Sequence, residues 1–101
     1  GVVFIRDVKI QKAVIVGGGY IGMESAEALA ERNVEVTVVE KLEYILVNFD
    51  REIAGLVLKH VRQKGVQVLL GEAVVGFEAD ESGRVRAVKT ETRTLPADLV
   101  I

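Results

Sequence analysis

The stretch "AVIVGGGYIGMESAEALAERNVEVTVVE", residues 13–40, decides the fold of this 101-residue chain. It opens with the apolar run Ala13–Val16, passes four glycines within six positions, and ends in a β-branched run that closes on Glu40. Between these ends, Tyr20–Arg32 is rich in alanine, glutamate and leucine, lacks proline, and predicts a helix. Strand, glycine turn, helix and strand within about thirty residues are typical of a right-handed βαβ unit.

Two helices and further strands are expected around this unit. The second helix starts at the N-cap Asp50 and stops near Gly65. The expected inner face of the first helix is Ile21, Ala26, Leu29 and Ala30. That of the second helix is Ile53, Leu56, Val57, His60 and Val61. His60 has no nucleophile or metal ligand near it in sequence, so we interpret it as a structural helix residue.

After the third predicted strand, Val66–Leu70, the pattern changes to an antiparallel hairpin of Ala73–Ala79 and Arg84–Thr90. A last strand is expected at Leu99–Ile101, and the apolar Gly1–Ile5 has no clear assignment. The sequence therefore predicts an α/β fold: a Rossmann-like parallel sheet with helices on one face and an antiparallel three-stranded β-ribbon on the other. The ribbon is expected to combine the exit of the third strand with the hairpin.

Composition excludes several classes of function. Thirteen Lys and Arg against fifteen Asp and Glu, without a basic block, argue against a nucleic-acid partner. No apolar run approaches the roughly 20 residues of a membrane span, so we expect no membrane and a cytoplasmic location. The absence of cysteine excludes disulfides, zinc-thiolate sites and a thiol nucleophile in this chain. We expect residues 1–101 to form a single domain.

The glycine turn matches G-x-G-x-x-G, a pattern of dinucleotide-binding domains. Gly17 suits the tight turn, Gly19 suits close approach of a ligand, and Gly22 suits close packing of helix on strand. Gly18 and Ile21 contribute nearby backbone. Because the following helix directs N–H groups and the positive end of its dipole at the turn, a pyrophosphate is the expected ligand.

Glu40 lies eighteen residues after Gly22, at the carboxyl end of the second strand. An acid there accepts hydrogen bonds from the adenosine ribose and repels a 2′-phosphate, which favours NAD(H) over NADP(H). The adjacent Lys41 would soften that preference. Two alternatives stay open: a tight turn with a solvated strand end and no ligand, and an adenosylmethionine site. A protein kinase loop fits less well, because a helix follows these glycines.

From Ala13 onward the sequence resembles the NADH-binding domain of the FAD-dependent pyridine nucleotide-disulfide oxidoreductases. The resemblance is strongest to the NADH oxidase, NADH peroxidase and coenzyme A-disulfide reductase branch, and it runs on through "NFDREIAGLVLKHVRQKGVQVLLGEAVVGFE" to "LPADLVI". It implies that Tyr20 lies over the nicotinamide pocket and that Glu24 approaches the nicotinamide. A packed aromatic residue and an acid favoured by the helix dipole are the structural alternatives.

The resemblance also implies partners that this sequence lacks. Family members carry an FAD domain, redox-active cysteine and a dimerisation domain, so this chain is expected to be the NAD(H)-binding part of a larger, homodimeric flavoprotein. The connection before the first strand is shorter than in similar domains, which suggests residues missing near Val8–Lys12. The alternative is a stand-alone, non-catalytic nucleotide-binding or interaction module. Three aromatic residues are expected in the core or at a subunit contact: Tyr44, Phe49 and Phe77.

Overall fold

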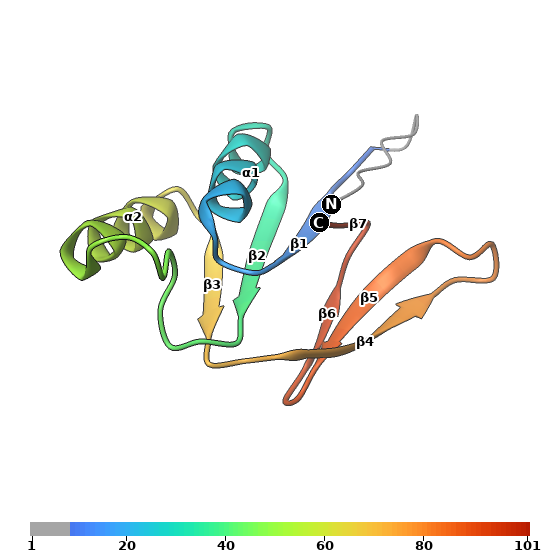
Figure 1. Cartoon of the computed structure of the whole chain (residues 1–101). Helices are drawn as coiled ribbons and strands as arrows, with labels where there is room; N and C mark the ends of the chain where they lie inside the picture. Colours follow the sequence, from blue (N-terminus) through green and yellow to red (C-terminus); the bar gives the residue numbers. More distant parts are fainter. Residues whose placement is uncertain (1–8) are drawn as a thin grey trace.

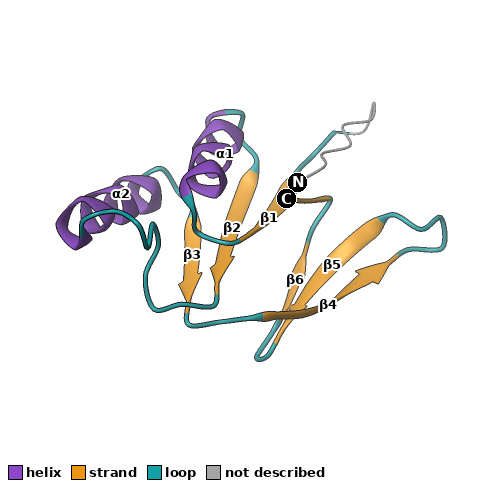
Figure 2. Ribbon diagram, in the orientation of Figure 1, coloured by secondary structure: helices purple, strands orange, loops and turns teal. Residues whose placement is uncertain are grey.

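A computed structural model describes residues 9–101 of the chain. The apolar segment Gly1–Ile5, and Val8 within the suggested gap, lie outside the described residues. Within them the chain forms an α/β fold with two sheets (Figures 1 and 2). The strands of the first sheet are parallel, in the order β3-β2-β1-β7, and those of the second are antiparallel, in the order β4-β5-β6. The predicted fold class is confirmed.

The parallel sheet is built from two consecutive βαβ crossovers. Its elements are β1 (Lys12–Val16), α1 (Tyr20–Glu31), β2 (Glu35–Glu40), α2 (Arg51–Gln63) and β3 (Gln67–Leu70). The short strand β7 (Leu99–Val100) adds to the free side of β1. The helix ends follow the sequence signals: Asn33 takes a left-handed conformation (φ 62°) after α1, and the Asp50 carboxylate caps α2 by accepting from the Glu52 N–H at 2.9 Å.

Alternate residues of the strands face two different cores, because side chains on a strand point to opposite faces of the sheet. Ile15 and Val38 pack on the helix side, against Met23 and Ala26 of α1 and against α2. Val14 and Val39, their neighbours in sequence, pack on the other side with residues that include Val88 and Ala97. Both helices therefore cover one face of the sheet, and the ribbon covers the other, as Figure 1 shows.

The ribbon contains β4 (Val74–Ala79), β5 (Val85–Thr90) and β6 (Thr94–Pro96). The predicted hairpin is confirmed, but the third strand is β6 and not the exit of β3. Local sequence signals hardly indicate β6, because it has only three residues and includes Pro96. A proline lacks the N–H that an inner strand needs, and β6 lies at the ribbon edge, where this loss is tolerated.

The predicted inner faces of the helices are partly wrong. On α1, Ala26, Leu29 and Ala30 belong to the core, but Ile21 is 74% exposed. On α2 the buried residues are Ala54 and Val61, supported by Val57 and Leu58, while Ile53 and Leu56 are exposed. The inner stripe of α2 thus passes through the smaller Ala54, and its larger apolar neighbours lie outside it.

Candidate functional site

The glycine turn joins β1 to α1 at the carboxyl end of the parallel sheet, and two of its glycines are required by its shape. Gly17 has a φ of 104°, which residues with side chains rarely adopt, and its N–H donates to the Val39 carbonyl at 2.8 Å. A Cβ on Gly22 would lie 2.5 Å from the Gly17 carbonyl oxygen and 3.3 Å from the Ile15 side chain. The predicted structural roles of Gly17 and Gly22, tight turn and close packing, are confirmed.

The N-terminus of α1 is open. Gly19 is the N-cap residue, and no side chain caps the helix. The first N–H that bonds back to the turn is that of Met23, which donates to the Gly19 carbonyl at 3.0 Å, so the N–H groups before it have no intrahelical partner. A Cβ built on Gly19 meets no atom within 4 Å. Free donors, the positive end of a helix dipole and bare backbone together suit an anion.

The Glu40 carboxylate holds the turn from the adjacent strand. One carboxylate oxygen accepts from the Gly18 N–H at 2.8 Å and the other from the Leu42 N–H at 2.8 Å. The Gly18 N–H is therefore used inside the protein. Each oxygen keeps a second lone pair that is available to a ligand hydroxyl. The sequence predicted that Glu40 binds a ligand or is a solvated strand end, and both predictions missed this role, which depends on two strands lying side by side.

Residues 41–50, between β2 and α2, form the wall of the turn and are called the wall loop below. Its Leu46 N–H donates to the Gly18 carbonyl at 2.9 Å. Its Ile45 side chain lies where a Cβ on Gly18 would project, 2.7 Å from that position. Gly18 is therefore fixed on three sides, by Glu40, Leu46 and Ile45. Only Glu40 and Lys41 of this region were expected to contribute to the site.

The two residues expected near a nicotinamide, Tyr20 and Glu24, both lie exposed on α1. Tyr20 is 58% exposed, and its ring stacks on the Phe49 ring of the wall loop, with centroids 6.3 Å apart and planes 15° apart. Tyr20 thus does not pack on the sheet. Lys41 is also exposed, beside Glu40.

Two further expectations from the sequence concern residues outside the turn. Of the two places expected for Tyr44, Phe49 and Phe77, the core is wrong, because they are 46%, 43% and 62% exposed, and a subunit contact stays a prediction. His60 lies on the surface, where its Nε2 is 3.1 Å from a Glu27 carboxylate oxygen. This contact between the two helices gives His60 a structural partner.

A buried acid joins the two sheets. Glu72 is 8% exposed, and its N–H donates to the Glu40 carbonyl at 3.0 Å. Its carboxylate accepts from the Thr90 hydroxyl at 2.6 Å and pairs with Arg93 Nε at 3.0 Å. The Thr90 hydrogen bond first, and then the Arg93 charge, lower the pKa of Glu72 against the opposing effect of burial. This charge is fully partnered, so we assign it to structure.

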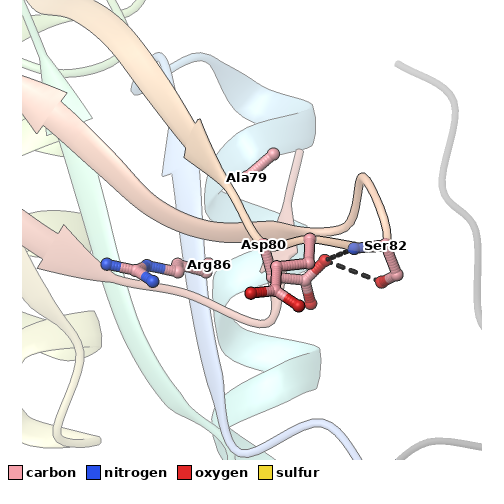
Figure 3. A pocket seen from close by; sticks show the side chains of 5 residues that line it. Ala79, Asp80, Ser82 and Arg86 are labelled. Carbon is pink, nitrogen blue, oxygen red and sulfur yellow. Dashed lines mark hydrogen bonds between the residues drawn. The ribbon is translucent and has the colours of Figure 1, made fainter.

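A hollow of about 500 Å³ lies at the β4–β5 turn of the ribbon (Figure 3). Asp80 accepts there from the Ser82 N–H at 2.9 Å and hydroxyl at 2.7 Å, and from the Arg84 N–H at 3.0 Å. The Ser82 and Arg84 bonds lower the pKa of Asp80. Because its carboxylate is committed to the turn, the hollow is a feature of turn geometry and not a second site.

The chain is similar to a protein family, to individual protein sequences and to solved structures. The family model described as pyridine nucleotide-disulphide oxidoreductase matches residues 12–94. An NADH oxidase of Enterococcus faecalis is 41% identical over 92 residues, which are 90% of this chain and 21% of that protein. Monodehydroascorbate reductases and a dihydrolipoyl dehydrogenase are similar as well. The chain therefore spans about a fifth of the length of these relatives.

Solved structures share the fold. An FAD-dependent pyridine nucleotide-disulphide oxidoreductase of Desulfovibrio vulgaris matches with a TM-score of 0.86 and 41% identity, over 92% of this chain and 24% of that one. The water-forming NADH oxidase of Lactobacillus brevis, bound to NADH, matches with a TM-score of 0.81 and 28% identity, over 92% and 20%. An engineered form of it, an NADPH oxidase bound to NADPH, carries five substitutions. They lie at a glycine, at an aspartate eighteen residues later, at the two residues after that aspartate, and at a proline.

These names imply FAD and NAD(H) as the cofactors of the family. Among residues 9–101, no helix has the length and apolar character that crossing a membrane requires. The family model covers most of the chain, and the relatives are oxidoreductases. The chain belongs to the pyridine nucleotide-disulphide oxidoreductase family.

Proposed function

We propose that this chain is the NAD(H)-binding domain of an FAD-dependent oxidoreductase, and that it holds NADH for hydride transfer to FAD on another domain of the parent protein. The observation that carries the proposal is the uncapped N-terminus of α1 facing a glycine turn with open space at Gly19. A pyrophosphate fits such a place, because its oxygens accept from free N–H groups and its charge complements the helix dipole.

The residues present fit the two ends of a dinucleotide. Gly17, Gly19 and Gly22 shape the pyrophosphate turn, and the backbone of Gly18 and Ile21 lies beside it. The free lone pairs of Glu40 are available to the adenosine ribose. In the other direction from the turn, Tyr20 and Glu24 would flank the nicotinamide.

We further propose a preference for NADH over NADPH. The negative charge of Glu40 would repel a 2′-phosphate, and Lys41 would partly offset that repulsion. The engineered NADPH oxidase supports this assignment, because its substituted glycine and aspartate have the spacing of Gly22 and Glu40. Two of its three further substitutions would then correspond to Lys41 and Leu42.

NADH and the protein would contribute different parts of the reaction. The chemistry that NADH supplies when bound is donation of a hydride, and the protein's contribution here is to bind and orient the dinucleotide. Within the described residues, Tyr20 would cover the nicotinamide end and Glu24 would lie one helical turn further along α1. The partners would be the FAD domain and a second copy of the parent chain.

Titration calorimetry of the 101-residue chain with NADH and, separately, NADPH tests the proposal. Gly19→Val is the informative variant: Gly19 has an extended backbone (φ −77°) and free space around it, so valine leaves the fold intact and obstructs only a ligand. Gly55→Val, at an open position on α2, is the matched control. We expect tighter binding of NADH than of NADPH, lost in Gly19→Val and retained in Gly55→Val.

Circular dichroism of each variant separates a lost site from a lost fold. A folded chain that binds neither dinucleotide contradicts the proposal and favours a non-catalytic interaction module. Equal binding by wild type and Gly19→Val contradicts the location of the site.

A further inference from the structure

Arg51, the first residue of α2, gathers the wall loop around its side chain. Its guanidinium donates to the carbonyls of Ile45 at 3.3 Å, of Leu46, and of Phe49 at 2.9 Å. It also lies over the Tyr44 ring, 4.3 Å from the centroid. Among residues 9–101, no carboxylate forms an ion pair with Arg51. Its donors therefore serve the loop backbone.

The first connection from Arg51 to the glycine turn passes through Leu46. Leu46 is buried, with 4% of its surface exposed. Its φ of 53° is a left-handed conformation that is unfavourable for leucine. The conformation persists only where surrounding contacts hold it. Here Arg51 binds the Leu46 carbonyl, and the Leu46 N–H donates to the Gly18 carbonyl at 2.9 Å. Arg51 also binds the Ile45 carbonyl, which belongs to the same peptide group as the Leu46 N–H. One side chain thus holds the carbonyl groups of Ile45 and Leu46 beside the N–H that supports Gly18.

The second connection passes through Phe49. Arg51 binds the Phe49 carbonyl, and the Phe49 ring stacks on Tyr20 at the start of α1. Phe49 precedes the N-cap Asp50, and its N–H donates to the Leu46 carbonyl at 2.9 Å, so Arg51 adds a second hold on the Phe49 backbone. The two connections meet the candidate site on both sides of the α1 N-terminus, at Gly18 and at Tyr20.

We propose that Arg51 is a positioning residue of the dinucleotide site, acting through Leu46 on the glycine turn and through Phe49 on Tyr20. This inference rests on the proposed function. An arginine suits the role because its planar fork presents five donors to several carbonyls at once. A lysine supplies the charge without that fork.

The test uses Arg51→Gln with Arg62→Gln as matched control. Arg62 lies on the same helix and also donates to a backbone carbonyl, that of Val68 at 3.0 Å, but it contacts β3 and not the wall loop. Two readouts are compared with wild type: backbone amide and Tyr20 ring resonances of the ligand-free chain, and the NADH dissociation constant. Urea denaturation reports the stability of each variant.

In Arg51→Gln we expect displaced resonances of Gly18, Leu46 and the Tyr20 ring. We also expect about tenfold weaker NADH binding by the folded chain, the effect of a displaced turn that loses one hydrogen bond to the charged pyrophosphate. Arg62→Gln should lower stability while leaving these resonances in place and NADH affinity within about twofold, because Arg62 holds β3 and is not linked to the glycine turn through the wall loop. Arg51→Lys should fall between wild type and Arg51→Gln.

The inference would be overturned if Arg51→Gln left the resonances of Gly18, Leu46 and Tyr20 at their wild-type positions. It would also be overturned if wild type bound NADH and Arg51→Gln bound it with the same affinity. The two proposals fail separately. If wild type does not bind NADH, the proposed function fails, while the resonances of the ligand-free chain still decide whether Arg51 positions the turn.

Discussion

Glu40 is predicted to stabilise the fold in the absence of any ligand. Glu40→Ala removes the acceptor of two backbone N–H groups, those of Gly18 and Leu42. Glu40→Gln keeps the length of the side chain but offers one acceptor oxygen in place of two and no charge. A residue that serves only to bind ribose would show no effect on the free energy of unfolding.

The size of the effect follows from the surroundings of the two donors. Gly18 is buried beneath Ile45, so we expect water to replace Glu40 poorly as the partner of its N–H, and an unsatisfied buried donor costs about 1–3 kcal/mol. Leu42 is exposed, so water replaces its lost partner at little cost. We expect a loss of about 2 kcal/mol for Glu40→Ala and about 1 kcal/mol for Glu40→Gln, whose remaining oxygen still serves Gly18.

Urea denaturation without ligand measures both values. With a slope of about 2 kcal/mol per M for a small domain, Glu40→Ala should lower the midpoint by about 1 M. Glu24→Ala, an exposed acid on α1, is the control and should change stability by no more than about 0.5 kcal/mol. Equal midpoints for Glu40→Ala, Glu24→Ala and wild type would refute the reasoning.

Three further predictions concern the core, the sheet junction and cofactor selection. Ile45→Ala should cost about 2–5 kcal/mol in urea denaturation, because the side chain is 1% exposed and packs on Gly18; a loss below about 1 kcal/mol would contradict this. The pKa of Glu72 is lowered in the fold, so its stabilisation is present above the ordinary value of 4.5 and lost as pH falls through the lowered pKa. Urea midpoints from about pH 7 to about pH 3 should therefore fall less steeply in Glu72→Gln than in wild type, and identical slopes would count against the assignment. Lys41→Glu should widen the calorimetric preference for NADH over NADPH by roughly twofold to fivefold, the effect of an exposed charge, and a narrower preference would argue against its place beside the ribose.

Much of the fold followed from local sequence signals. Three features were predictable because each depends on residues close together in sequence. They are the apolar run before the glycines, the second strand that ends at Glu40, and the N-cap Asp50. The turn roles of Gly17 and Gly22 were predictable for the same reason, since a known spacing requires them.

The contacts that shape the site depend on segments distant in sequence. The bond from Gly18 to Glu40 joins positions 22 residues apart, and it exists because β1 and β2 pair in parallel. The hydrophobic residues of the wall loop show no regular spacing. The left-handed turn at Leu46 and the hydrogen bonds of Arg51 could therefore not be predicted from nearby sequence. The errors on α2 have a similar cause: a periodicity of large apolar residues favoured Ile53 and Leu56, while tertiary packing selected Ala54.

The measurement that tests the central claim most directly is a titration of the isotopically labelled chain with NADH, followed through its backbone amide resonances. Binding at the glycine turn predicts that the largest changes fall on Gly17, Gly19, Tyr20, Ile21 and Glu40, with little change in the ribbon strands β4 and β5. Saturating NADH that shifts none of these amides, or shifts mainly those of the ribbon, would contradict the claim that this turn holds the dinucleotide.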